Sequence, residues 1–153
     1  MNLLIILTAQ YLYIMPIIYF ALTLIFSRMR RPLIILSLLA FFIDFAFVKL
    51  LGSIISSPRP FVSEHIHPLI SHVADNGFPS DHTLLTMTIA AVIFTFNKKV
   101  GITLALISVA VGISRILAHI HHPIDILGAI GIAIFSVTCS WYILKRVKLL
   151  FNL

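Results

Sequence analysis

The stretch LLIILTAQYLYIMPIIYFALTLIF, residues 3–26, decides the fold, because it carries no charge over its whole length. A run of roughly 18 apolar residues is enough to cross a hydrocarbon core about 30 Å thick. Residues 100–113 and 126–144 form two further uncharged runs. The chain is 60% hydrophobic and only 10% charged, whereas a soluble domain is about a quarter charged. The sequence therefore predicts a polytopic membrane protein.

Hydropathy and polar punctuation predict an all-α bundle of about five transmembrane helices in a single domain, residues 1–153. The expected helices are Leu3–Ser27, Leu33–Ser56, Ser80–Phe96, Val100–Leu117 and Ile124–Leu144. The first run lacks both the basic start and the cleavage pattern of a signal peptide, so we expect it to be a membrane helix. The longest link, residues 57–79, is expected to be a loop.

The basic residues predict the orientation of the bundle. Most of them fall on one face of the five-helix arrangement: Arg28, Arg30, Arg31, Lys98, Lys99, Lys145, Arg146 and Lys148. The positive-inside rule makes that face cytoplasmic, with the N-terminus outside and the C-terminus inside. The net charge of +6 then reflects topology, and no nucleic acid partner is expected. All seven histidines fall on the outer side.

Three cations near the outer face predict an anion site. Lys49, Arg59 and Arg115 lie where an unpaired charge is costly, so a common anionic partner is expected. The planar arginine guanidinium suits phosphate, because it can donate to two oxygens at once. Ser80 is a good N-cap, and the free N–H groups of Asp81 and its neighbours would add an anion-binding helix N-terminus.

Two histidines and one aspartate fit acid–base and nucleophilic roles. His121 and Asp125 are four residues apart, so they share one helix face if Pro123 lies in the first turn. A carboxylate on one ring nitrogen leaves the other free to attack phosphorus. His82 would donate a proton to the leaving oxygen. This chemistry needs no metal and no cofactor.

Other histidines favour plainer interpretations. We expect His65, His67, His72, His119 and His122 to be interfacial residues. Asp44 is expected to make a buried polar contact. The seven histidines also leave open a metal-binding or transport module, since His is a common metal ligand.

In chain order, these clusters resemble the three-part signature of the type 2 phosphatidic acid phosphatase superfamily. Its third part, Ser-Arg-x5-His-x3-Asp, matches residues 114–125 without exception. Its second part, Pro-Ser-Gly-His, matches residues 79–82 with Asp81 in place of Gly. Its first part, Lys-x6-Arg-Pro, keeps Arg59 and Pro60, but Lys49 lies ten residues before Arg59 and Gly52 holds the usual lysine position.

The resemblance implies roles for these residues. His121 would form a phosphohistidine, Asp125 would support it, and His82 would be the general acid. Arg59, Arg115, Lys49 and the N–H groups around Ser80 and Asp81 would bind phosphate. Family members usually have six transmembrane helices, one more than this chain predicts.

The segment Phe78-Pro79-Ser80-Asp81-His82 is most similar to the bacterial undecaprenyl-pyrophosphate phosphatases. This implies hydrolysis of undecaprenyl pyrophosphate to the monophosphate at the outer face of the cytoplasmic membrane, which recycles the cell-wall lipid carrier. Another lipid phosphate, such as phosphatidylglycerophosphate, phosphatidate or lipid A, remains an alternative substrate, and phosphotransfer an alternative reaction. The lipid bilayer and a lipid phosphate are the expected partners.

Overall fold

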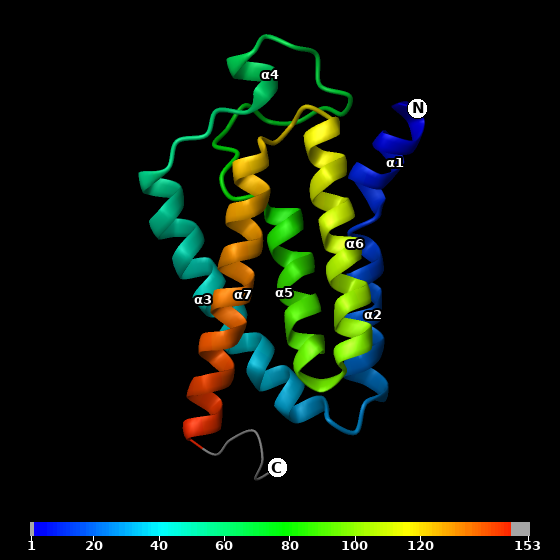
Figure 1. Cartoon of the computed structure of the whole chain (residues 1–153), viewed down its shortest axis with the longest axis vertical. Coiled ribbons are helices and arrows are strands. Elements are labelled where there is room, and N and C mark those ends of the chain that lie inside the picture. Colours follow the sequence, from blue (N-terminus) through cyan, green and yellow to red (C-terminus); the bar gives the residue numbers. More distant parts are fainter. Residues whose placement is uncertain (1, 148–153) are drawn as a thin grey trace.

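Helices form where the uncharged runs occur, and the computed structural model describes residues 2–147 as an all-α bundle (Figure 1). The helices are α1 (Asn2–Tyr11), α2 (Ile14–Phe26), α3 (Arg30–Ile54), α4 (Pro60–Ser63), α5 (Asp81–Phe96), α6 (Lys98–Leu117) and α7 (Pro123–Arg146). The predicted fold class is confirmed. The predicted long loop, residues 57–79, carries only the single turn of α4.

The first predicted helix differs from the structure, because it is broken into α1 and α2 by a turn at Leu12 and Tyr13. Pro16 explains the break: a proline has no N–H, and its ring clashes with the carbonyl four residues earlier. That carbonyl belongs to Leu12, and it accepts a 3.2 Å hydrogen bond from the amide of Met15 instead.

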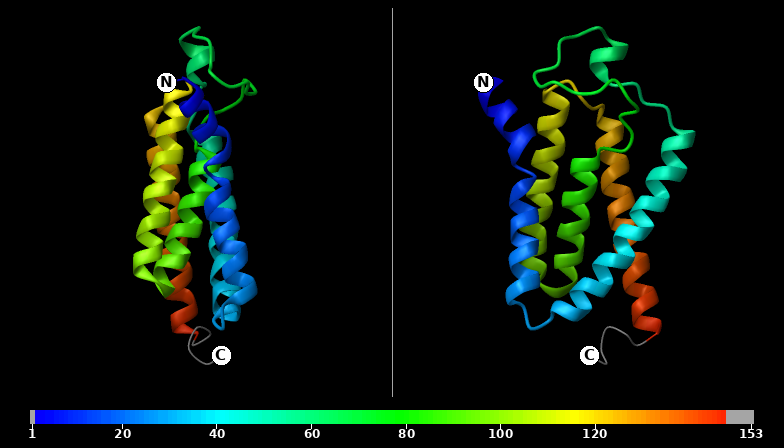
Figure 2. Two further views of the ribbon diagram at one scale, coloured as in Figure 1. Left: turned by 90° about the vertical axis from the view of Figure 1, so that its right-hand side faces the viewer. Right: turned by 180° about the vertical axis from the view of Figure 1, so that it is seen from behind.

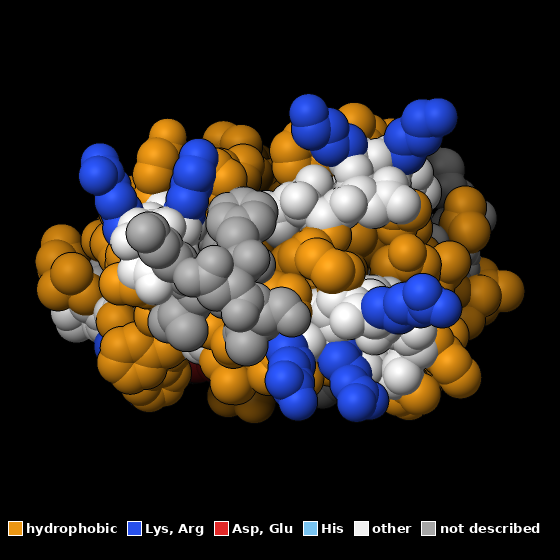
Figure 3. Space-filling view, turned by 90° about the horizontal axis from the view of Figure 1, so that it is seen from below, with side chains coloured by type: hydrophobic (Ala, Val, Ile, Leu, Met, Phe, Trp, Pro, Cys, Tyr) orange, Lys and Arg blue, Asp and Glu red, His pale blue; other side chains and the backbone are white. Residues whose placement is uncertain are grey.

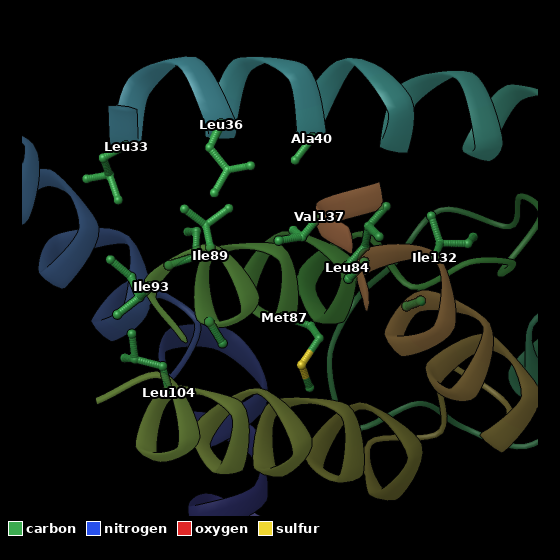
Figure 4. Close-up of a cluster of buried hydrophobic side chains, with 14 of the residues drawn as sticks. Leu33, Leu36, Ala40, Leu84, Met87, Ile89, Ile93, Leu104, Ile132 and Val137 are labelled. Carbon is green, nitrogen blue, oxygen red and sulfur yellow. The ribbon is translucent and has the colours of Figure 1, made fainter. Parts of the chain in front are cut away.

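Helix α5 lies at the centre of the bundle and contacts α2, α3, α6 and α7 (Figures 1 and 2). Figure 4 shows the core that surrounds it, where side chains of α3 face those of α5. The labelled core residues are Leu33, Leu36, Ala40, Leu84, Met87, Ile89, Ile93, Leu104, Ile132 and Val137. Leu36 and Ala40 are fully buried. The core therefore fixes α5, whose first turn carries Asp81 and His82.

The outside of the bundle is apolar as well. Several large apolar side chains on α3, α6 and α7 expose 65–70% of their surface: Leu38, Phe42, Leu106 and Leu127. Within residues 2–147, four segments are long and apolar enough to cross a membrane: 2–26, 30–54, 98–117 and 123–146. Helix α5 has only 16 residues. This is a multi-pass membrane protein whose outer side chains face lipid.

The two ends of the bundle carry different side chains. Lys and Arg gather on the end seen in Figure 3, where α2 ends, α3 and α6 begin and α7 ends. The long loop, the α6–α7 link and α1 lie at the opposite end (Figure 2). Lys148 lies outside the described residues. That the basic end is cytoplasmic stays a prediction.

Candidate active site

His121 and Asp125 form a bonded pair where α7 begins. Pro123 occupies the first turn and His122 the N-cap, so the carboxylate three residues later turns back toward the chain before the helix. Asp125 Oδ2 accepts hydrogen bonds from His121 Nδ1 at 3.2 Å and from the His122 amide at 2.9 Å. The His121 side chain is 3% exposed and that of Asp125 0%. With Nδ1 bonded to Asp125, the lone pair of His121 lies on Nε2.

Arg59 is hydrogen-bonded to that second nitrogen of His121. Its Nη1 donates to His121 Nε2 at 3.2 Å and to the Ile120 carbonyl at 2.8 Å. Its Nε donates to Asp75 Oδ1 at 2.6 Å. The guanidinium is buried, and its Nη2 makes no hydrogen bond to any residue in the range 2–147. An anion bound at Nη2 would lie beside His121 Nε2.

Arg115 supplies a second buried cation from the last turn of α6. Its Nη1 donates to the Ala9 carbonyl at 3.2 Å and its Nη2 to His72 Nε2 at 3.3 Å. Its Nε is buried and has no partner among the described residues. Buried donors are almost always bonded, so an unpartnered one calls for an acceptor. An anionic oxygen is the acceptor that suits a guanidinium.

The start of α5 is tied to the start of α7. The Ser80 amide donates to the Asp125 carbonyl at 3.2 Å, which brings the second motif beside the third. Ser80 is the N-cap residue, as predicted, but its side chain caps no amide of the helix; Thr83 donates to its hydroxyl at 3.2 Å instead. Asp81 is exposed and His82 is half-buried, with its ring against Tyr13.

Lys49 is not brought into this cluster. Its side chain is exposed, and its Nζ lies over the Phe45 ring of its own helix, 5.6 Å from the centroid. Gly52 faces the loop instead, since a Cβ there would lie 3.6 Å from the Phe78 carbonyl. Three residues of helix rotate a side chain by about 300°, so Lys49 points roughly 60° away from that direction. Its phosphate-binding role stays a prediction.

His72 lies beside the candidate site, a contact that the expectation of an interfacial residue did not include. Its Nδ1 donates to the Val73 carbonyl at 3.3 Å while its Nε2 accepts from Arg115. Its ring centroid is 6.3 Å from that of His121. Its loop position gave no periodic signal, and its partner lies 43 residues away in sequence.

Asn76, which the sequence analysis did not single out, fastens the loop to the end of α3. Its Nδ2 donates to the carbonyls of Gly52 and Ile55 at 3.0 and 2.9 Å, and its Oδ1 accepts from the Ser57 amide at 2.9 Å. Its neighbour Gly77 then lies against Asp125: a Cβ at Gly77 would be 2.9 Å from Asp125 Oδ2. Only a residue without a side chain fits this approach.

Burial and neighbouring cations shift the pKa values of the groups in these loops. Burial lowers the pKa of His121 below its usual 6.5, the Asp125 hydrogen bond partly opposes this, and Arg59 and Arg115 lower it further. Burial and the charge of Arg59 lower the pKa of His72. The hydrogen bond from Arg59 lowers the pKa of Asp75. Both imidazoles are therefore neutral near pH 7, as a nucleophile must be.

The histidines do not assemble into a metal centre in the part of the chain described. Within residues 2–147 no group of three or more His, Cys, Asp or Glu side chains is arranged to hold a metal ion. His122 instead donates to the Pro58 carbonyl at 3.0 Å and lies 3.9 Å from Glu64. An apolar pocket of about 590 Å³, lined by residues such as Phe94, Ile134 and Trp141, contains none of the clustered polar residues.

Comparison with known proteins finds bacterial relatives. The chain is 37% identical over 108 residues to the "bacitracin transport permease protein BcrC" of Bacillus licheniformis, which covers 70% of this chain and 53% of that protein. It is 43% identical over 77 residues to the "undecaprenyl-diphosphatase BcrC" of Bacillus subtilis, covering 50% of this chain and 40% of the relative. The chain thus spans about half the length of the curated relatives it matches.

A solved structure shares the fold. The crystal structure of Aquifex aeolicus LpxE superposes with a TM-score of 0.70 at 23% identity, covering 92% of this chain and 85% of that one. The family model described as the PAP2 superfamily matches residues 32–148, a range that contains all three motifs. The chain therefore belongs to the PAP2 superfamily.

Proposed function

We propose that this protein is a lipid phosphate phosphatase that removes the terminal phosphate of undecaprenyl pyrophosphate through a phosphohistidine on His121. One observation carries the proposal: His121 Nε2, freed by the bond from Nδ1 to Asp125, lies 3.2 Å from a buried arginine. That arginine and Arg115 each keep a donor nitrogen with no partner among residues 2–147. The proposed nucleophile contacts one proposed phosphate ligand directly, and the second is linked to it through His72.

In the first step, His121 Nε2 attacks the terminal phosphorus. A bond forms between Nε2 and phosphorus, and the bond from phosphorus to the bridging oxygen breaks. Asp125 stabilises the positive charge that develops on the imidazole, because it accepts from Nδ1. Arg59 and Arg115 stabilise the negative charge on the equatorial oxygens. His82 donates a proton to the bridging oxygen, and the lipid monophosphate leaves.

In the second step, water attacks the phosphohistidine. The bond from Nε2 to phosphorus breaks, inorganic phosphate forms, and His82 accepts the proton of the attacking water. The imidazole of His121 returns to its neutral state with its proton still shared with Asp125. The chain's own residues supply every proton acceptor and donor in this cycle.

The lipid is proposed from similarity. The segment Phe78-Pro79-Ser80-Asp81-His82 is similar to that of bacterial undecaprenyl-pyrophosphate phosphatases, and one relative bears the name undecaprenyl-diphosphatase. The predicted orientation puts the site at the outer face of the cytoplasmic membrane, where a recycled cell-wall carrier would be dephosphorylated.

A substrate panel with purified protein in detergent tests the proposal. The panel contains undecaprenyl pyrophosphate, phosphatidylglycerophosphate, phosphatidate and lipid A, and the readout is released phosphate. We expect the highest kcat/KM with undecaprenyl pyrophosphate. We expect His121→Ala to lose at least about 1,000-fold in kcat, since removing a nucleophile leaves only binding and electrostatic catalysis.

His67→Ala is the matched control, because His67 is an exposed histidine of the same end of the molecule. It should keep wild-type activity. Retained phosphate release in a folded His121→Ala protein would contradict the mechanism. A preference for another lipid phosphate would contradict the substrate, and transfer of phosphate to a second lipid instead of water would contradict hydrolysis.

A further inference from the structure

The end of α1 and the turn that follows it contact the candidate active site at two points. Because Pro16 breaks the helix, the amide of Tyr13 does not close a helical bond to Ala9. The Ala9 carbonyl accepts instead from Arg115 Nη1 at 3.2 Å. The Tyr13 ring packs against His82, with centroids 4.5 Å apart and planes at 88°. Helix α1 thus touches a proposed phosphate ligand through Ala9, and the turn after it touches the proposed general acid through Tyr13.

The two proposed catalytic histidines are oriented in different ways. His121 is held by hydrogen bonds at both ring nitrogens, from Arg59 and to Asp125. The His82 side chain makes no hydrogen bond to any residue in the described range; its only specific contact there is the edge-to-face packing with Tyr13. A ring without hydrogen bonds rotates more freely about its terminal torsion unless a neighbour blocks it. Tyr13 is that neighbour.

We propose that Tyr13 is a positioning residue that holds the His82 imidazole at the angle needed to protonate the leaving oxygen. The inference rests on the proposed function, because it assumes His82 as general acid. Edge-to-face aromatic pairs have a preferred geometry, so the tyrosine ring selects one orientation of the imidazole.

The contact comes from outside the part of the chain that defines the family. The family model begins at residue 32, whereas Tyr13 and Ala9 belong to the first membrane segment. Helix α1 lies against α6, and the turn that follows it reaches the start of α5 (Figure 2). The N-terminal segment therefore completes a site whose other members all lie in the family region.

A double-mutant cycle tests the proposal. We would measure kcat and KM for undecaprenyl pyrophosphate with the wild type, Tyr13→Ala, His82→Ala and the double variant, all as full chains in detergent, with enzyme concentration raised for the slow variants. A general acid contributes about 10²–10⁴-fold, and we expect its misorientation to lose about tenfold in kcat with KM within about twofold. In the His82→Ala background, Tyr13→Ala should change kcat by less than about twofold, because residues that act as a unit are not additive.

Three further variants make the result specific. Tyr13→Phe keeps the ring and should restore kcat to within about threefold of the wild type. Tyr13→Leu fills most of the same space without an aromatic ring, so it replaces Tyr13→Ala if that variant does not fold, and we expect the same loss. Tyr11 lies two residues before Tyr13 and is 57% exposed. Tyr11→Ala should therefore behave as the wild type.

Equal losses in both backgrounds would overturn the proposal, because they would mean that Tyr13 acts on the fold and not through His82. Unchanged kcat in Tyr13→Ala would overturn it as well. Failure of the proposed function looks different: a wild type inactive on the substrate, or a His82→Ala variant with full activity, would remove the general acid on which the inference depends and so overturn both.

Discussion

Two buried carboxylates lie in this bundle, and their surroundings differ. Asp125 begins α7 at the loop end and accepts from His121 and from the His122 amide. Asp44 lies within α3, 4% exposed, and accepts one hydrogen bond, from the Thr88 hydroxyl of α5 at 2.7 Å. Thr88 is seven residues past the start of α5, which is roughly 10 Å along the helix axis. The two carboxylates therefore belong to separate layers of the molecule.

The neighbours of each carboxylate, and not its burial, indicate which of the two is a candidate for a role in the reaction. Intramembrane carboxylates are functional candidates by default, so burial alone does not distinguish the two. Asp125 bonds an imidazole whose other nitrogen accepts from Arg59, and the charges of Arg59 and Arg115 act on that imidazole. Asp44 contacts hydroxyl-bearing helices and no other charged group in the described residues. The proposed function therefore uses Asp125 in the reaction, and we expect Asp44 to serve helix packing.

The largest expected effect is that of Asp125→Asn. The amide keeps the size of the carboxylate but loses the charge that stabilises the imidazolium and selects the tautomer. We expect kcat to fall about 10³–10⁴-fold, with the protein still folded. Phosphate release from undecaprenyl pyrophosphate and the elution volume in detergent give the two measurements. Activity within tenfold of the wild type would mean that Asp125 does not serve His121.

A smaller loss is expected from Gly77→Ala, which replaces none of the proposed catalytic residues. The added Cβ would lie 2.9 Å from Asp125 Oδ2 and 3.1 Å from the Ser57 carbonyl, so the carboxylate or the loop must shift. We expect a decrease of roughly 10–100-fold in kcat, because small displacements of catalytic groups are costly.

Gly131→Ala is the matched control for that substitution, since a Cβ there meets no atom within 4 Å. It should change kcat by less than about twofold. If Gly77→Ala behaves like Gly131→Ala, the position of Asp125 is not set by the loop, and the Asn76 anchor has no bearing on the site.

Part of the difference between the two carboxylates could be predicted from the sequence. The spacing of His121 and Asp125, with Pro123 between them, predicts a shared helix face, and the structure has the bond. The helices followed from apolar runs, because a membrane segment must satisfy its backbone internally. Pro16 was visible in the sequence, yet the break before it was not predicted, because apolar length alone favoured one continuous helix.

The contacts made by the long loop, residues 57–79, could not be predicted from the sequence. His72, Asp75 and Asn76 meet partners 16 to 43 residues away, and a loop has no periodicity that would reveal such pairing. The direction of Lys49 was also beyond the sequence. Its distance from Arg59 predicts a depth, but which side of α3 faces lipid is set by packing against α5 and α7.

The pH dependence of kcat tests whether the imidazole bonded to Asp125 is the group that must be neutral. Burial lowers the pKa of His121 below 6.5, and the neutral imidazole is the form that attacks. Activity is therefore present above that lowered pKa and is lost as the pH falls through it. We expect the acid limb of kcat against pH to lie below 6.5, with a loss of about tenfold per pH unit beneath it.

His72→Gln serves as the control for that profile, since it removes a second loop imidazole whose pKa is lowered. The acid limb should stay where it is. A limb that moves with His72→Gln would assign the titration to the loop histidine. A limb above 6.5 would mean that burial and the nearby arginines do not lower the pKa of His121.

The smallest expected effect on activity is that of Asp44. Asp44→Asn keeps an acceptor for Thr88 and should leave kcat within about twofold of the wild type, because no proposed reacting group touches Asp44.

Asp44→Leu removes the acceptor, and we expect it to lower the free energy of unfolding by about 1 kcal/mol, the usual size of a hydrogen bond between membrane helices. Titration with a denaturing detergent measures that change, and Thr88→Val, which removes the donor, should give a similar loss with no further loss in the double variant. If a folded Asp44→Asn protein loses activity on the scale of Asp125→Asn, the separation of the two layers fails, and charge in the bundle interior contributes to the reaction at its end.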